Sequence, residues 1–378
     1  MKETEMITIR GKYNFAHVFI DEIDETTREQ IESMMNHPAF ANSQIRIMPD
    51  CHAGAGSVVG FTAKLNEYVI PNVVGVDIGC GIYSYNLGKL KPDFPSLDNF
   101  IRTDIPHGFN IRNDVYSENG EYNKFEEELG DLIDLLELDK SKVEKSAGSL
   151  GGGNHFIEFG EDDNGDNWLT VHSGSRNFGL QVATFFQKRA KDLMKESNHA
   201  VPSGTEYLPM EAGGKAYLDA MRIAQNFAHF NREIMAEQII RFLRVEVKNA
   251  VFSVHNYIDF SDNIIRKGAI RAYEGEKVVI PFNMRDGLII AKGKSSQKWN
   301  YSAPHGAGRI MSRKQAKKNV NLHDFSYTMK DIYTTCMNKN TLDEAPFVYK
   351  DKEIILNNIK ETVDVELWVK PKYNFKSN

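Results

Sequence analysis

Apolar and polar residues alternate along several short stretches of the chain, and glycines separate many of these stretches. Alternation or a β-prone composition predicts strands over residues 6–9, 56–62, 278–292 and 362–369. Helical spacing of the apolar positions predicts helices over residues 26–36, 124–138 and 309–318. The mixture predicts a β-rich body with helices packed against it.

The longest helical pattern occupies about residues 178–247 and lies between two β-prone runs that end in His172 and His255. We therefore expect a helical excursion packed on the β-rich body. No linker rich in proline, glycine or serine divides the chain, and no internal repeat is present. Because residues with metal-ligand chemistry extend from 77 to 305, the chain must close on itself to gather them. The pattern predicts one compact α+β domain over residues 1–378.

Composition narrows the class of protein. With 41% hydrophobic and 26% charged residues, the 378-residue chain resembles ordinary globular proteins, and no apolar run approaches the roughly 20 residues of a membrane span. The charged N-terminus lacks the apolar core of a signal peptide, so we expect a cytoplasmic protein with no membrane association. Three cysteines without CxxC spacing argue against a disulfide framework.

The net charge of −6 argues against a dedicated, non-specific nucleic-acid coat protein. It does not exclude an enzyme that acts on nucleic acid, because a local basic cleft supplies the few phosphate contacts needed. A basic run near the C-terminal third fits the rim of such a cleft, and it fits a solvated helix face equally well. The run contains Arg309, Arg313, Lys314, Lys317 and Lys318.

Five side chains with metal-ligand chemistry lie in glycine-rich turns or at the ends of β-prone runs: Asp77, Cys80, His155, His172 and His255. Any one of these histidines could equally be satisfied by a structural hydrogen bond. As a set, five ligands exceed the three or four of one catalytic zinc site, and a thiolate can bridge two ions, so the set predicts a two-metal centre. Ligand softness favours zinc, with manganese lower in the affinity order.

A further histidine, His305, lies among small residues, with Arg309 four positions later. Glycines around it let the backbone approach a bulky phosphate, and a neutral imidazole can attack phosphorus to give a phosphoramidate. Two divalent ions and Arg176 or Arg309 would neutralise the charge of a triphosphate. Asp50, just before His52, is a candidate to orient a functional group from behind.

Together these segments resemble the RtcB family of RNA-splicing ligases. The shared motifs keep one order along the chain: PDCH at 49–52, VGVDIGCG at 74–81, GSLGGGNHFIE at 148–158, VHSGSRNFG at 171–179, SVHN at 253–256, SAPHGAGRIMSR at 302–313 and DEAP at 343–346. The resemblance implies the family's single α+β domain, with mixed β-sheets around a deep metal cleft.

The resemblance also implies an RNA ligase that joins 3′-phosphate or 2′,3′-cyclic phosphate ends to 5′-hydroxyl ends with GTP and two Mn²⁺ ions. His305 would take GMP from GTP and pass it to the RNA 3′-phosphate, which the 5′-hydroxyl then attacks as GMP leaves. The positions that match the manganese ligands are Asp77, Cys80 (as the bridge), His155, His172 and His255.

The positions that match the nucleotide site are Asn154, His155, Glu158, His255, Asn256, Pro281, Asn283, Met284, His305, Gly306, Ala307, Gly308, Arg309 and Lys376. Lys376 matches the family's base-contacting lysine near the C-terminus. RNA with the ends named above is the implied partner, and an archease-like activator is a second partner that the resemblance suggests.

The chain departs from the family pattern at residues 281–287, where PFNMRDG replaces a small-residue loop of the PGSMGT type. That loop helps to hold the nucleotide, so the guanine preference and the pocket shape of this chain are open. The chain is also shorter than typical splicing ligases, which leaves RNA repair and tRNA splicing both open as its role.

Two other functions fit parts of the sequence. A metal-dependent cyclic phosphodiesterase, or RNA-end hydrolase, would need the metal ligands but not His305. A non-catalytic protein that binds RNA ends or metal would have kept the core for stability. The intact pair of His305 and Arg309 speaks against both.

Overall fold

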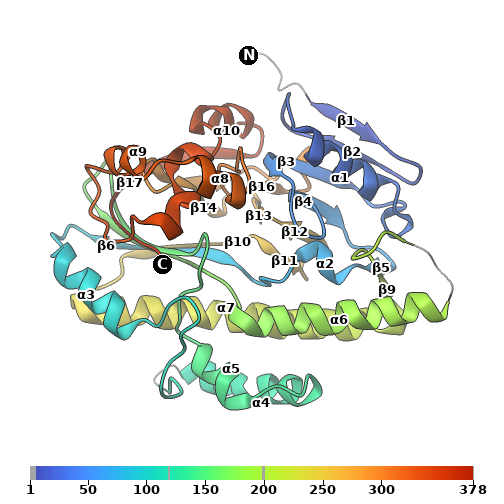
Figure 1. The fold of residues 1–378 in the computed structure, drawn as a ribbon, viewed down its shortest axis with the longest axis horizontal. Helices are drawn as coiled ribbons and strands as arrows, with labels where there is room; N and C mark the ends of the chain where they lie inside the picture. The colour runs from blue at the N-terminus through green and yellow to red at the C-terminus, as the bar shows by residue number, and fades with distance from the viewer. Residues whose placement is uncertain (1–5, 118–119, 198–200, 378) are drawn as a thin grey trace.

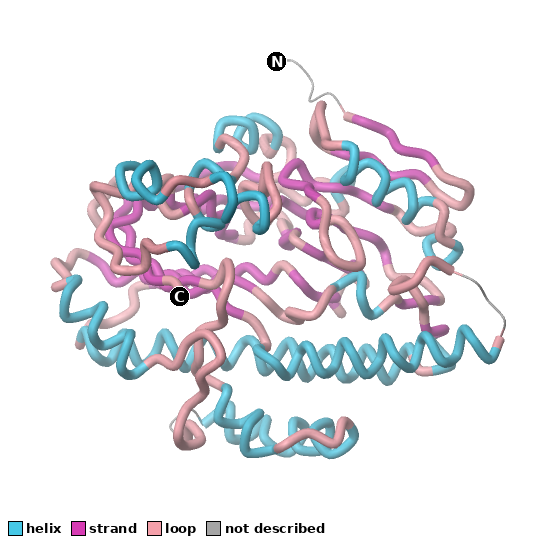
Figure 2. Tube along the Cα trace, in the orientation of Figure 1, coloured by secondary structure: helices cyan, strands magenta, loops and turns pink. Residues whose placement is uncertain are grey.

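The computed structural model describes residues 6–117, 120–197 and 201–377, and it consists of two large β-sheets above a layer of long helices (Figures 1 and 2). The α+β class predicted from the sequence is confirmed. Among the described helices, none combines the length and the apolar character that a membrane crossing requires.

The first sheet has six strands in the spatial order β1-β2-β3-β4-β12-β11. Its members are β1 (Ile7–Arg10), β2 (Phe15–Val18), β3 (Ile45–His52), β4 (Val59–Lys64), β12 (Ile264–Lys267) and β11 (Asn256–Asp259). Strands β2 and β3 run parallel and the other pairs are antiparallel, so the sheet is mixed.

The second sheet has seven antiparallel strands in the order β10-β6-β8-β7-β17-β15-β14. Its members are β10 (Asn249–Val254), β6 (Gly81–Gly88), β8 (Asn167–Ser173), β7 (Phe156–Asp162), β17 (Val363–Phe375), β15 (Gly287–Gly293) and β14 (Lys277–Asn283). The C-terminal strand β17 lies in the interior of this sheet, with Asn374 opposite Glu158. The end of the chain is therefore built into the body of the protein.

Short elements complete the β-structure. The pairs are β13 (Ala269–Arg271) with β16 (Ser302–Pro304), and β5 (Tyr68–Val69) with β9 (Leu208–Pro209). Strand β16 ends at Pro304, directly before His305, and its pairing with β13 fixes the backbone position from which the His305 side chain extends.

Two long helices, α6 (Arg176–Glu196) and α7 (Gly214–Leu243), lie side by side beneath the sheets, and α4 (Gly120–Leu135) and α5 (Lys140–Ser146) lie below them (Figure 1). Helices α6 and α7 occupy the interval, about residues 178–247, in which the sequence predicts a helical excursion. The remaining α-helices are α1 (Glu25–Met35), α2 (Pro71–Val74), α3 (Phe94–Asp104), α8 (Arg313–Asn319), α9 (Leu322–Thr328) and α10 (Lys352–Asn358). The short 3₁₀ helices are η1 (Pro38–Phe40), η2 (Met210–Ala212), η3 (Gln297–Trp299), η4 (Lys339–Glu344) and η5 (Pro346–Val348).

Helix boundaries follow local capping chemistry. Helix α1 begins after Asp24, whose side chain accepts a hydrogen bond from the Thr27 amide at 3.0 Å. The helix predicted from residue 309 begins only at Arg313, because Gly308 has a φ of 74° and Ser312 forms a capping box with Gln315. The prediction for that first turn is wrong, and the extended segment leaves the glycines after His305 free to line a cavity.

Helix α7 packs closely against the turn that precedes β6. A Cβ atom on Gly79 would lie 2.8 Å from the Cβ atom of Ala228 on α7, so only glycine fits at this contact. Gly79 also has a φ of 71°, which glycine adopts without strain. The close contact sets the position of Cys80, the next residue, relative to the long helix.

Candidate active site

The five predicted metal ligands reach one place from neighbouring strands. Asp77 and Cys80 lie in the turn before β6, His155 precedes β7, His172 is in β8, and His255 lies between β10 and β11. Strands β10, β6, β8 and β7 are adjacent, and His172 pairs in register with both Ile82 and Phe156. The sheet therefore presents these side chains at one end of its strands.

The donor atoms of the ligands converge. The Cys80 Sγ atom lies 3.4 Å from His155 Nε2 and 3.3 Å from His172 Nε2. His155 Nε2 lies 2.8 Å from Asp77 Oδ2, and His172 Nε2 lies 3.3 Å from His255 Nε2. Cys80, His155 and His172 form a buried group that could hold a metal ion. One sulfur, three nitrogens and one carboxylate oxygen fit transition-metal chemistry.

The environment of the cluster keeps two of its imidazoles neutral, as metal ligands must be, whereas its thiol loses its proton only when a cation binds. Burial, together with nearby positive groups, lowers the pKa of His172 and of His255 well below the usual value, so both imidazoles are neutral and offer lone pairs. Burial and the neighbouring Asp77 raise the pKa of the Cys80 thiol well above its usual value. A bound metal ion deprotonates a coordinating thiol outright.

Helix α7 supports the ligand turns from below. The Arg232 guanidinium is fully buried, and its Nη1 donates to the carbonyls of Gly79 at 2.7 Å and Ser173 at 2.6 Å. Those two residues precede Cys80 and follow His172. Asn231 donates to the Gly174 carbonyl at 2.9 Å and accepts from the Ser149 amide at 2.9 Å. The helical excursion therefore holds the turns around the ligands in place.

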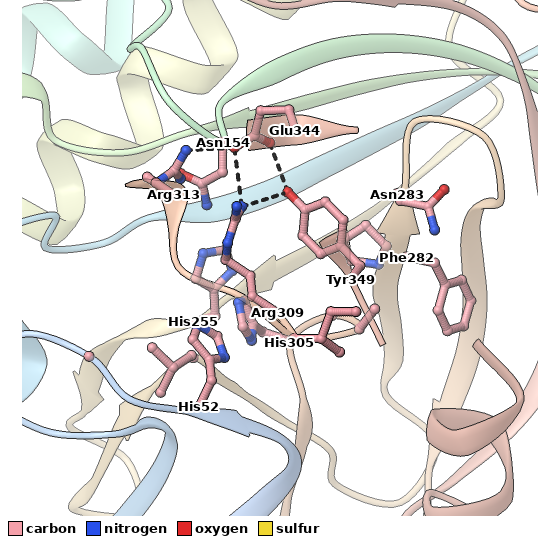
Figure 3. A pocket seen from close by; sticks show the side chains of 18 of the residues that line it. His52, Asn154, His255, Phe282, Asn283, His305, Arg309, Arg313, Glu344 and Tyr349 are labelled. Carbon is pink, nitrogen blue, oxygen red and sulfur yellow. Dashed lines mark hydrogen bonds and ion pairs between the residues drawn. The ribbon is translucent and has the colours of Figure 1, made fainter. Parts of the chain in front are cut away.

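His305 lies next to the metal-ligand cluster. Its ring centroid is 4.8 Å from that of His255 (Figure 3). Its Nδ1 atom lies 2.6 Å from Oδ2 of the buried Asp50. Asp50 thus orients His305, and the other ring nitrogen, Nε2, is free of this contact. Gly308 brings the backbone close to Asp50, because a Cβ atom there would lie 2.1 Å from the Asp50 carbonyl oxygen.

A cavity of about 800 Å³ opens beside His305 and the ligand cluster. Every predicted site residue except His155 lines it; His155 lies behind, in contact with Cys80. The cavity walls include residues 306–308 and 281–284 on one side and Asn154, Glu158 and Lys376 on another. A volume of this size is typical of a site for a nucleotide-sized ligand.

Glu344 is the centre of an ion network on the cavity wall (Figure 3). Its buried carboxylate lies 2.9 Å from Lys376 Nζ and 2.6 Å from Arg313 Nη1, and it accepts a hydrogen bond from the Tyr349 hydroxyl at 2.8 Å. Burial alone would raise the pKa of Glu344, but Lys376, Arg313 and Arg309 lower it to about 2. Lys376 also donates to the Asn154 carbonyl at 3.2 Å.

The arginines that were predicted to bind phosphate already form hydrogen bonds within the protein. Arg309 donates to the Asp343 carbonyl at 2.6 Å, and its guanidinium lies 5.2 Å from the centroid of the Tyr349 ring. Of the basic run, only Arg309 and Arg313 line the cavity. Arg176 is not among the lining residues, and it donates to the Gly108 carbonyl and to Ser149.

Glu158 is buried on the same wall and accepts a hydrogen bond from Asn374 Nδ2 at 2.9 Å. Burial raises its pKa to about 8, with Asn374 and Lys376 acting in the opposite direction. Near neutral pH this side chain is therefore largely protonated when the cavity holds no cation or base.

The hairpin between β14 and β15 carries the segment that departs from the family pattern. The Asn283 side chain accepts from the amides of Arg285 at 3.0 Å and Asp286 at 2.9 Å, and it donates to the Asp286 carboxylate at 2.7 Å. Phe282 stacks on Trp368 with 5.3 Å between ring centroids. Asn283 is thus engaged by its own loop although it lines the cavity.

Sequence reasoning missed several residues of this site. Glu344 belongs to a quoted motif but had no assigned role, and nothing in the sequence pattern indicated Tyr349 or Arg232. Lys267 lines the cavity, donates to the Ser57 carbonyl at 3.1 Å, and has a pKa lowered by burial to about 8. A lysine at the end of a β-prone run, directly before a glycine, is the one sequence feature that could have indicated this site residue.

Comparison with known proteins places this geometry in a family context. The family model described as "tRNA-splicing ligase RtcB" matches residues 30–377. The RNA-splicing ligase RtcB of Escherichia coli strain K12 is 31% identical, over 91% of this chain and 92% of that protein. The tRNA-splicing ligase RtcB of Nanoarchaeum equitans is 25% identical, over 81% of this chain and 82% of that protein.

The buried Glu158 predicts a pH-dependent stability. Glu158→Gln keeps an acceptor for Asn374 but cannot ionise. Because the pKa is raised from 4.5 to about 8, the stability linked to the protonated carboxyl is complete below pH 4.5 and is lost as the pH rises through 8. In thermal unfolding of metal-free protein, we expect similar melting temperatures near pH 5 and a higher one for the variant near pH 8.5. The control is Glu161→Gln on the same strand, where the carboxylate is partly exposed and lies 3.7 Å from Lys372 Nζ. Equal melting curves for wild type and Glu158→Gln at pH 8.5 would contradict the assignment.

The Glu344 network predicts a large stability effect. Among the described residues, Glu344 is the only carboxylate shared by Lys376 and Arg313, so Glu344→Gln leaves the buried Lys376 ammonium without a carboxylate partner, whereas the part-exposed Arg313 keeps Asp343 at 2.8 Å. We expect a loss of about 3 kcal/mol in the free energy of unfolding, measured by urea denaturation. Glu366→Gln, which breaks the exposed pair with Lys277, serves as the control and should change stability by less than about 1 kcal/mol. A loss at residue 344 no greater than that of the control would rule out this role.

Proposed function

The chain belongs to the RtcB family, and on that premise we propose that it is an RNA ligase that joins RNA 3′-phosphate or 2′,3′-cyclic phosphate ends to 5′-hydroxyl ends. The resemblance drawn from the motifs is thereby confirmed at the level of the family. The observation that carries the proposal is the position of His305, held by Asp50 at 2.6 Å and directly beside the ligand cluster.

We propose that His305 is the nucleophile that accepts GMP. The Nδ1–H group donates to Asp50, which leaves the Nε2 lone pair to attack the α-phosphorus of GTP. A P–N bond forms and pyrophosphate leaves. Asp50 stabilises the positive charge that develops on the ring, as a carboxylate behind a catalytic imidazole does.

At a 2′,3′-cyclic end, water first attacks the cyclic phosphorus and the bond to the 2′-oxygen breaks, which gives a 3′-phosphate. An oxygen of the 3′-phosphate then attacks the phosphorus bound to His305, the P–N bond breaks, and His305 is restored. The 5′-hydroxyl finally attacks the activated 3′-phosphate, a phosphodiester forms, and GMP leaves.

The ligand set fits two divalent ions, and we propose manganese. Asp77, Cys80, His155, His172 and His255 would hold them, with Cys80 shared, because Sγ lies within 3.4 Å of Nε2 of His155, just before β7, and of Nε2 of His172 in β8. When bound, such ions neutralise triphosphate charge and polarise its oxygens. His172 is fixed for this task by its Nδ1 contact with the Asn154 carbonyl at 3.2 Å.

We propose that the cavity binds GTP with its α-phosphate at His305. Residues 306–308 let the phosphate approach the backbone, and Glu158 and Lys376 supply an acceptor and a donor for the base. Asn256, Pro281, Asn283 and Met284 form further parts of the wall. A contact between Arg309 and phosphate would compete with its bond to Asp343.

The site residues extend from Asp50 to Lys376, and this spread supports our proposal that residues 1–378 act as one catalytic domain. The ligands begin at Asp77, the nucleophile is His305, and Lys376 closes the cavity from the last residues. An archease-like activator and a cytoplasmic location stay predictions, as does the choice between RNA repair and tRNA splicing.

Nucleotidyl transfer distinguishes the proposal from its alternatives. Incubation with α-labelled GTP and Mn²⁺ should give acid-labile, alkali-stable label on wild type and none on His305→Ala. Asp50→Asn should reduce the labelling rate about 10- to 100-fold, because the ring loses its orienting carboxylate. The exposed His323→Ala is the control and should label normally. Opening of cyclic phosphates without label would indicate a hydrolase, and neither activity would indicate a binding protein; both outcomes refute the ligase.

Metal content tests the shared thiolate. Wild type reconstituted with Mn²⁺ should bind two ions per chain, and Cys80→Ala should bind one or none while its circular dichroism spectrum stays unchanged. Cys336→Ser is the matched control, because Cys336 is also a free buried cysteine but lies outside the cavity lining. Two ions bound by Cys80→Ala, or normal nucleotidyl transfer in that variant, would refute a bridging role. Elemental analysis of protein purified without added metal decides between manganese and zinc.

A further inference from the structure

The outer face of strands β1, β2 and β3 is a second charged surface, away from the cavity. In the strand register, Thr8 lies opposite His17 and His17 lies opposite Arg46, while Arg10 lies opposite Phe15. Neighbours along β1 and β2, such as Ile9, Ala16 and Val18, point into the core and are buried. We call the outward set Arg10, Phe15, His17 and Arg46, with Lys12 and Tyr13 in the adjoining turn, the β1–β3 face.

Cations and rings alternate on this face. The Arg10 guanidinium lies 5.3 Å from the centroid of the Phe15 ring, and Lys12 Nζ lies 4.8 Å from that of Tyr13. Phe15 and Tyr13 are 39% and 40% exposed, which is high for side chains that could pack. Phe15 also contacts the His17 ring edge-on, with 5.1 Å between centroids. The rings are thus held in place by neighbours while one surface of each stays open.

The positive charge of the face lacks carboxylate partners. Within the part of the chain that the structure describes, Arg10, Lys12 and Arg46 form no ion pair, whereas Lys298 beside them pairs with Glu361 at 2.9 Å. Burial lowers the pKa of His17, and the charged groups that add to this effect are all cations: Arg46, Arg10 and Lys298. Uncompensated cations grouped in a protein with a net charge of −6 indicate an anionic partner.

Strand β3 connects this face to the cavity. Arg46 lies near its start, whereas Asp50 near its end holds His305, and His52 lines the cavity. Six residues of extended strand span about 20 Å. That distance corresponds to about six nucleotides at the ~3.4 Å spacing of stacked bases.

We propose that the β1–β3 face binds a single-stranded part of the RNA substrate, several nucleotides from the end that reacts at His305. This inference rests on the proposed ligase function. Arg10 and Lys12 contact phosphates, and Phe15 stacks on a base, the combination by which sequence-tolerant single-strand sites work. Arg46, whose guanidinium donates to the carbonyls of Lys298 and Ile45 at 2.8 Å each, adds positive charge to the face. An acidic protein would complement the charge but would have no use for flat open rings beside the cations.

The test compares a long and a short RNA on the metal-loaded enzyme without GTP. Both RNAs carry a 5′-hydroxyl and a 3′-phosphate; one has 16 nucleotides and the other three, too few to reach the face. We expect Arg10→Ala/Phe15→Ala to weaken binding of the long RNA at least about tenfold in fluorescence anisotropy. The variant should also lower the slope of log affinity against log salt by about one. Binding of the short RNA should not change.

The matched control is Leu180→Ala/Lys188→Ala, which removes one apolar and one positive side chain exposed on α6, on the other side of the molecule (Figure 1). The inference is overturned if the control weakens binding equally, if both RNA lengths are affected alike, or if polyglutamate competes as well as RNA of equal charge. Labelling of His305 by GTP needs no RNA and should be normal in Arg10→Ala/Phe15→Ala. Absent labelling in wild type would instead refute the proposed function.

Discussion

The structure depends on five polar side chains that meet at one point, of which Cys80, His155, His172 and His255 are buried and Asp77 is partly exposed. Two imidazoles lie within 3.4 Å of one thiol, and burial lowers the pKa of His172 and His255 while it raises that of Cys80. Such a group gains little from its own contacts, because several of its members are acceptors that face one another. A cation between them turns each of these acceptors into a ligand. The strand ends, the Gly79 turn and Arg232 on α7 hold the group in place before any ion arrives.

The Cys/His cluster and the proposed nucleotide wall of the cavity meet at one carbonyl group. The Asn154 oxygen accepts from His172 Nδ1 and from Lys376 Nζ, both at 3.2 Å. Lys376 is in turn held by Glu344, which also binds Arg313. A displacement of the C-terminal lysine therefore alters the partner that orients a metal ligand. This arrangement gives a physical reason why strand β17, the last of the chain, lies within the sheet rather than at its edge.

The sequence predicted what depends on short segments. Glycine-rich turns and histidines at strand ends indicated Asp77, Cys80, His155, His172 and His255, and the helical pattern indicated α6 and α7. It did not reveal Arg232 or Asn231, because buried polar residues on one helix face leave the apolar periodicity almost unchanged. Tyr349 and Asn374 reach the site only through long-range packing. Arg309 was expected to be free for phosphate, yet Asp343 and Glu344 hold it, and no local pattern records such a contact.

Under the proposed function, the altered hairpin at 281–287 would leave recognition of the nucleotide base to the opposite wall of the cavity. The side-chain amide of Asn283 forms its hydrogen bonds with Arg285 and Asp286, and Phe282 packs on Trp368. This loop therefore offers the cavity mainly apolar surface and backbone. The polar groups that remain across the cavity are Glu158 and Lys376. Their positions are fixed by strand pairing between β7 and β17 rather than by a loop. Selection of the proposed base would then depend on the sheet, and substitutions in the hairpin would alter the shape of the pocket more than its hydrogen bonding.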